Sequence, residues 1–150
     1  MFDLDWFDLA FVITAVFFNW CIVGVFIAQK KGRTKLVRRF GSTMLLLVIP
    51  LAVVFVNYVV EKRPLWIMIY FGFIFLYILV EWLLDYVFKI DFRHRLITHV
   101  PYIILEYAAL FGFIGISFAI DKTWGAIVSI SFWAVLGSLI YLYRGKAVQT

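Results

Sequence analysis

Three acidic side chains lie within, or at the edge of, long apolar stretches of the sequence: Glu81, Asp85 and Glu106. Acidic residues in such stretches are costly, so each is a candidate functional residue by default. Glu81 and Asp85 are four residues apart and share one face of a helix, and His99 and Glu106, seven apart, share another. If these two helices pack as an antiparallel pair, we expect the four residues to converge in one polar pocket.

The segment between these two faces supplies secondary candidates, namely Asp91, Arg93, His94 and Arg95. Two carboxylates in a medium of low dielectric constant repel each other when both are ionised, so one of them accepts a proton. Glu81 and Glu106 would form such a pair. The pocket is therefore expected to serve proton- or cation-coupled transport, or the binding of a small molecule.

A lipid-modifying enzyme is an alternative hypothesis. Carboxylate and imidazole groups could hold a divalent metal that engages a lipid phosphate. The residues concerned would be Asp85, Asp91, His94 and His99. No compact motif such as H-E-x-x-H occurs and the chain has only two histidines, so the sequence assigns no metal site and no cofactor. The P-loop, G-x-S-x-G and C-x-x-C patterns are absent as well.

A third hypothesis is purely structural. Glu81 and Asp85 would then pair with basic residues at the membrane edge, and Glu106 would bond a tyrosine or serine of a neighbouring helix. A noncatalytic subunit of a membrane complex would fit this hypothesis. The sequence is equally compatible with a homo-oligomer and with a subunit of a larger complex.

The elements that must position these residues are transmembrane helices. The chain is 65% hydrophobic and only 15% charged, and its mean hydropathy of +1.01 lies far above that of ordinary soluble domains. Five continuous apolar runs are each about 20 residues long, which is enough to cross a bilayer. We therefore predict an all-α integral membrane protein, a single transmembrane domain over 1–150, with spans at about 6–28, 43–60, 65–88, 100–120 and 123–143.

The basic residues predict the orientation of this bundle. Eleven of the 14 fall on one side, and only Lys62, Arg63 and Lys122 fall on the other. The positive-inside rule therefore places the N-terminus outside and the C-terminus in the cytoplasm, and we expect a prokaryotic cytoplasmic membrane. The first basic linker should contact anionic lipid headgroups rather than nucleic acid, through Lys30, Lys31, Arg33, Lys35, Arg38 and Arg39.

Aromatic and acidic residues at the predicted boundaries fit the same orientation. Tyr102 and Tyr143 fall near the inner boundary, where aromatic residues anchor helices at the interface. At the other end, Asp3, Asp5 and Asp8 are expected to form a solvated acidic terminus.

Local signals refine the predicted spans. Pro50 should remove a hydrogen bond to the carbonyl of Leu46 and bend the second span, whereas Pro101 suits the first turn of the fourth. Asp121 or Thr123 should cap the fifth span. Small residues should let the last two helices pack closely as a hairpin, or pack in a dimer, along two ridges: Ala108, Gly112, Gly115 and Ala119 on one, and Gly125, Ser129 and Gly137 on the other.

Overall fold

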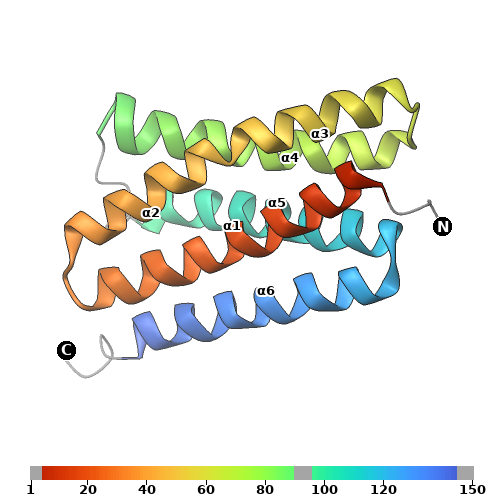
Figure 1. Cartoon of the computed structure of the whole chain (residues 1–150). Coiled ribbons are helices and arrows are strands. Elements are labelled where there is room, and N and C mark those ends of the chain that lie inside the picture. Colours follow the sequence, from red (N-terminus) through yellow and green to blue (C-terminus); the bar gives the residue numbers. More distant parts are fainter. Residues whose placement is uncertain (1–4, 90–95, 145–150) are drawn as a thin grey trace.

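In the computed structural model, which describes residues 5–89 and 96–144, the chain is a bundle of long helices (Figure 1). No strand occurs in these two ranges. In chain order the helices are α1 (Trp6–Lys30), α2 (Thr34–Leu46), α3 (Val48–Val60), α4 (Leu65–Trp82), the π-helical turn η1 (Leu83–Val87), α5 (Leu96–Ile120) and α6 (Lys122–Tyr143).

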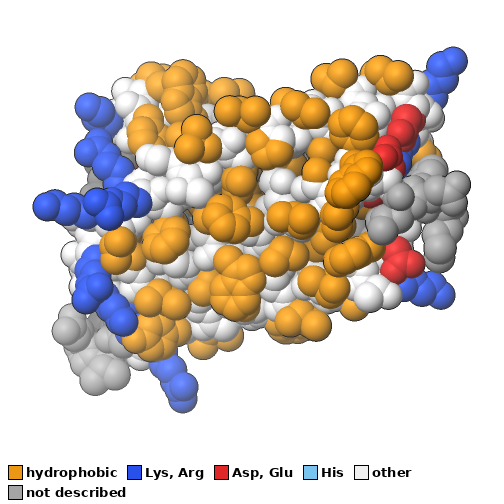
Figure 2. All heavy atoms as spheres, in the orientation of Figure 1, with side chains coloured by type: hydrophobic (Ala, Val, Ile, Leu, Met, Phe, Trp, Pro, Cys, Tyr) orange, Lys and Arg blue, Asp and Glu red, His pale blue; other side chains and the backbone are white. Residues whose placement is uncertain are grey.

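The helices form five segments that are long and apolar enough to cross a membrane, which confirms the predicted all-α, five-span architecture. α2 and α3 together make one span, and α4 continues through η1 to make another. Apolar side chains cover the flanks of the molecule, while lysine and arginine gather mainly at one end (Figure 2). We call this end, where α1 and α6 finish and α2 begins, the basic end.

The second span begins earlier than predicted, because α2 already starts at Thr34 within the basic linker. The basic residues in the first turns of α2 do not prevent helix formation, because they lie at the basic end of the bundle and not on its apolar sides. The helix is interrupted at Leu47, between α2 and α3. Pro50 has no N–H to donate to the carbonyl of Leu46, so the disruption predicted from this proline is found.

The prediction for Pro101 is wrong. α5 begins at Leu96, so Pro101 lies inside the helix rather than in its first turn. The apolar run starts only at Val100, but the helix extends beyond it toward the basic end. This extension places His99 and Tyr102 on the same helix as Glu106.

Two glycines of the small-residue ridge of α5 pack against α4, whereas the predicted contact was the hairpin with α6 or a dimer. A Cβ atom added at Gly112 would lie 3.2 Å from the backbone oxygen of Tyr70 in α4, and one at Gly115 would lie 2.6 Å from its ring. Gly125 fits the predicted hairpin contact, because a Cβ atom added there would lie 2.3 Å from the ring of Phe118 in α5. The close approach of α4 and α5 brings the helices of Glu81 and Glu106 together.

α6 lies against both α5 and α1. Its N-terminus is capped by Asp121, whose carboxylate accepts a 2.7 Å hydrogen bond from the backbone N–H of Thr123, so the cap was correctly predicted. Farther along, Asn19 of α1 donates a 2.7 Å hydrogen bond to Ser131 of α6. α1 is thus central in the bundle, and its side chains face the cavity described next.

Candidate functional site

A cavity of about 70 Å³ lies in the half of the bundle nearer the basic end. One water molecule needs roughly 10–15 Å³ of such space, so the cavity is sized for about five waters or for one small ion with part of its hydration shell. We call it the inner site. Its polar lining comes from α1, α4, α5 and α6: Gln29, Tyr77, Glu81, His99, Tyr102, Glu106 and Tyr143.

Glu81 ends a chain of hydrogen-bonded hydroxyl groups. The Tyr102 hydroxyl donates to Glu81 Oε2, and the hydroxyl oxygens of Tyr77 and Tyr102 are 3.1 Å apart. A tyrosine has one hydroxyl hydrogen, so Tyr77 must donate to Tyr102 when Tyr102 donates to the carboxylate. All three side chains are at least nine-tenths buried. The chain therefore links α4 and α5 through groups that can pass a proton.

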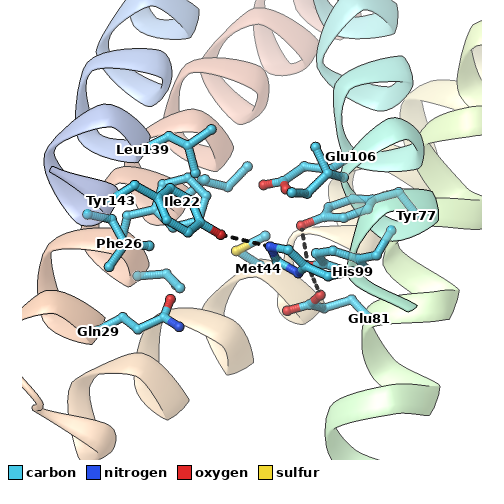
Figure 3. Close-up of a pocket in the computed structure, with 14 residues that line it drawn as sticks. Ile22, Phe26, Gln29, Met44, Tyr77, Glu81, His99, Glu106, Leu139 and Tyr143 are labelled. Carbon is cyan, nitrogen blue, oxygen red and sulfur yellow. Dashed lines mark hydrogen bonds between the residues drawn. The ribbon is translucent and has the colours of Figure 1, made fainter. Parts of the chain in front are cut away.

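Glu106 lies one helical turn beyond Tyr102 and faces the same cavity. Like Glu81, it is only 5% exposed, and both glutamates line the cavity together with Tyr77. Figure 3 shows Glu106, Tyr77 and Glu81 following one another along one wall of the cavity. Two carboxylates from neighbouring helices thus share one small space.

His99 closes the inner site toward the basic end. Its Nε2 lies 2.8 Å from the hydroxyl of Tyr143, the last residue of α6, and its ring is stacked on that of Tyr102. Figure 3 shows the bond between His99 and Tyr143 reaching across the cavity. Tyr102 and Tyr143 were predicted to be interfacial anchors, but Tyr102 is 8% exposed and bonds Glu81 instead of the interface.

Asp85 does not line the inner site. It lies in a wider and more open hollow of about 470 Å³ at the basic end, which we call the basic-end groove. The groove also contains Lys35 and Arg38, and it shares Val25, Gln29 and Glu81 with the inner site. Three of the four primary candidates therefore line one cavity, while Asp85 lines the groove beside it.

The remaining candidates are distributed as follows. Asp91, Arg93, His94 and Arg95 lie outside the residues that the structure describes. Within the described ranges, no three His, Cys, Asp or Glu residues are grouped closely enough to hold a metal ion. Lys30, from the basic linker, donates to the carbonyl of Tyr141 and lies 3.7 Å from the centre of its ring. Lys31, Arg33 and Arg39 are exposed at the basic end.

A second polar cluster, at the opposite end of the bundle, was not predicted. Asp8 is fully buried, which contradicts the expected solvated terminus. Arg63 donates to both Asp8 oxygens, at 2.8 and 3.2 Å, and the Tyr58 hydroxyl donates to Oδ1 at 2.5 Å. Asp5 caps α1 instead. We call Asp8, Tyr58 and Arg63 the outer cluster.

Arg63 is held in its charged form within the outer cluster. Burial lowers the pKa of its guanidinium, but the hydrogen bonds to Asp8 and Glu61 raise it above the ordinary value. Arg63 Nε lies 2.7 Å from Glu61 Oε2, and the guanidinium lies 3.9 Å from the centre of the Tyr58 ring. The position of Asp8 three residues inside the first apolar run was the signal that could have identified it.

An aromatic column separates the inner site from the outer cluster. Neighbouring rings lie 5.1–6.5 Å apart, in the order Tyr77, Phe18, Phe113, Phe11 and Tyr58. Each of these five residues is at most 1% exposed. Buried, contacting rings therefore lie between the inner site and the outer cluster, whereas the inner site adjoins the groove at the basic end.

The chain matches no protein-family model, and no curated protein or solved structure matches it. Its function must therefore be inferred from its own residues. The five apolar spans make it a polytopic membrane protein. Buried carboxylates, hydroxyl groups and an imidazole around one small cavity are suited to binding protons or cations.

Proposed function

We propose that this protein binds a proton or a small monovalent cation at the inner site and moves it across the membrane, with Glu81 and Glu106 as the groups that carry the charge. The observation that carries this proposal is the shared cavity, in which two buried carboxylates from α4 and α5 face one small space. We propose transport of the cation, and not only its binding, because the cavity adjoins a surface groove through which the cation can enter and leave.

The chemistry of the lining favours a cation over an anion. Among the residues that the structure describes, the acidic groups of the lining are the two glutamates, and no lysine or arginine lines the cavity. Two ionised carboxylates would repel each other here, and each would cost about 2.5–3.5 kcal/mol by analogy with charged residues at the centre of a membrane helix. A single proton or cation between them removes most of this repulsion, so the pair binds and releases one positive charge as a unit.

The size of the site limits the cargo. A space of about 70 Å³ is too small for a drug-sized organic cation, since pockets for such ligands measure about 300–1,000 Å³. Protons, alkali cations and ammonium remain. The tyrosine chain suits a proton in particular. When Glu81 is protonated, its O–H can donate to Tyr102 and Tyr102 can donate to Tyr77, so both hydrogen bonds reverse and the hydroxyl hydrogen of Tyr77 turns into the cavity.

The route to the site runs from the basic end, which we assign to the cytoplasm on the basis of its lysines and arginines. Gln29 and Glu81 line both the inner site and the basic-end groove, so they stand between the two. The aromatic column shuts the other side. A state open to one side only is what alternating access requires, and opening of the column would complete the cycle.

The test uses purified protein in liposomes that contain a pH-sensitive dye. A gradient of Na⁺, K⁺ or NH₄⁺ is imposed in separate experiments, and the internal pH is followed; a pH gradient alone tests a uniport of protons. The wild type should change the internal pH faster than protein-free liposomes under at least one condition. Glu81→Gln/Glu106→Gln should reduce this rate about 100-fold, as expected when a proton-carrying group is lost.

Glu61→Gln is the control, because Glu61 is a carboxylate 36% exposed beyond the opposite end of the aromatic column. It should leave the rate unchanged. A wild type that never exceeds protein-free liposomes would overturn the proposal and leave the enzyme and subunit hypotheses. A double variant with wild-type flux would show that some other part of the protein carries the charge.

A further inference from the structure

Two hollows lie between the α2–α3 helices and the α4–η1 helix, and we call the line along which they follow each other the seam. On the α2–α3 side, residues at helical spacing face α4: Thr34, Arg38, Gly41, Leu45 and Val48. On the α4–η1 side, a matching series follows the same line: Gly72, Phe75, Leu79, Trp82 and Tyr86. Because positions three and four apart stack on one helix face, the basic-end groove and a second hollow lie end to end along this seam.

The second hollow is apolar and faces the region where lipid would lie. Its volume is about 720 Å³, and every side chain in its lining is apolar. Leu79 and Trp82 are 49% and 45% exposed. A Cβ added at Gly72 would meet no atom within 4 Å, so the wall is open there. We call this part of the seam the apolar hollow.

Among the described residues, the polar part of the seam has basic side chains on one wall and acidic side chains on the other. The α2 wall carries Lys35 and Arg38, and the α4–η1 wall carries Glu81 and Asp85. Tyr86 lies between the polar and the apolar part, where its hydroxyl is 3.1 Å from Ser42 Oγ and 3.3 Å from the carbonyl of Arg38. A ligand that matches the whole seam must therefore carry both charges at one end and a long apolar chain at the other.

We propose that the seam between α2–α3 and α4–η1 binds a phospholipid with a zwitterionic primary-amine headgroup, of the phosphatidylethanolamine type. Its phosphate would lie against Lys35 and Arg38, and its ammonium against the carboxylate wall. One acyl chain would occupy the apolar hollow. This site is independent of the proposed transport, although a headgroup in the groove would lie beside Glu81, where the inner site opens.

The charges on the two walls distinguish this lipid from its relatives. An arginine can donate two parallel hydrogen bonds to a phosphate, which any phospholipid would accept. A primary ammonium can donate up to three hydrogen bonds to the carboxylate wall, whereas a choline headgroup has no N–H and a glycerol headgroup has no positive charge. The acidic wall therefore provides the selectivity, and the basic wall provides affinity for phosphate.

The test is a competition experiment. Detergent-purified protein is incubated with equal amounts of phosphatidylethanolamine, phosphatidylcholine and phosphatidylglycerol that carry the same acyl chains, and the retained lipid is counted by native mass spectrometry. The wild type should retain phosphatidylethanolamine preferentially. Arg38→Gln should lower this retention about fivefold, the effect expected for one basic contact. Its neighbour Arg39→Gln is the matched control, because Arg39 does not line the groove.

Two further variants test the other contacts. Asp85→Asn should abolish the preference for phosphatidylethanolamine over phosphatidylglycerol while total retention stays similar. Gly72→Leu should reduce retention of all three lipids, whereas Gly137→Leu, placed where a Cβ also meets no atom within 4 Å, should not. Equal retention of the three lipids by the wild type, or equal effects of Arg38→Gln and Arg39→Gln, would overturn the proposal. A preference for phosphatidylglycerol would overturn it too.

Discussion

Replacing Arg63 with alanine is expected to lower the free energy of unfolding by about 3–5 kcal/mol, the range measured when one partner of a buried ion pair is removed. Asp8 would lose both guanidinium hydrogen bonds and remain a carboxylate with no exposed surface. The hydroxyl of Tyr58 and the backbone N–H of Asp5 would still donate to it, but neither carries a positive charge. Reversible unfolding in detergent micelles, followed by circular dichroism, measures the change.

Glu61→Gln serves as the control for this prediction. Glu61 also bonds Arg63, but its side chain is 36% exposed, and exposed pairs contribute about 0–1 kcal/mol. Asp8→Asn/Arg63→Met should recover part of the loss, because the double variant leaves no buried charge. Equal losses for Arg63→Ala and Glu61→Gln would show that burial of Asp8 does not matter to stability.

The spans and much of the inner site follow from local patterns in the sequence. Long uninterrupted apolar runs predict the helices, because a helix is the simplest structure that satisfies its own backbone in lipid. The spacing of Glu81 and Asp85 predicts a polar face on one helix, and the spacing of His99 and Glu106 predicts a polar face on the next. Because consecutive spans run antiparallel, these two faces lie at the same depth in the bundle. The structure brings these three residues to one cavity, while their functional role stays a prediction.

The outer cluster could not be predicted in the same way, because its partners are far apart in the sequence. Asp8 is separated from Arg63 by 55 residues, and no spacing rule connects two different helix ends. Near the chain terminus an aspartate is usually solvated, so burial was not expected. Only the packing of α1 against α3 brings Tyr58 and Arg63 over Asp8 and excludes water from it.

The tyrosines show a second limit of sequence patterns. An aromatic residue near a predicted boundary fits an interfacial anchor and a buried hydrogen-bond donor equally well. Tyr102 has the second role, because α5 starts five residues before Pro101 and turns this side chain toward Glu81. The helix start was predicted too late, since Thr98 and His99 precede the apolar run. The predicted start of this helix was about one helical turn too late, and the hydrogen-bonded chain of Tyr77, Tyr102 and Glu81 was not predicted.

Phe113→Ala is expected to cost about 3–5 kcal/mol of stability and to raise the passive leak of protons. The stability estimate is the one for a buried Phe→Ala change in a soluble protein core. Phe113 has no exposed surface, and its ring lies 5.1 Å from Phe18 and 5.8 Å from Phe11, so both neighbours would lose packing contacts. Unfolding in micelles measures the first effect, and dye-loaded liposomes under a pH gradient measure the second.

The two effects separate a packing role from a sealing role. Phe73→Ala removes a ring that is 41% exposed and outside the column, so it should change both measurements little. If Phe113→Ala destabilises the protein and leaves the leak at the wild-type level, the column is only a packed core. If the leak rises, the gap left in the column has admitted water between the inner site and the outer cluster. The wild-type column would then be the barrier that any transport cycle through the inner site must open.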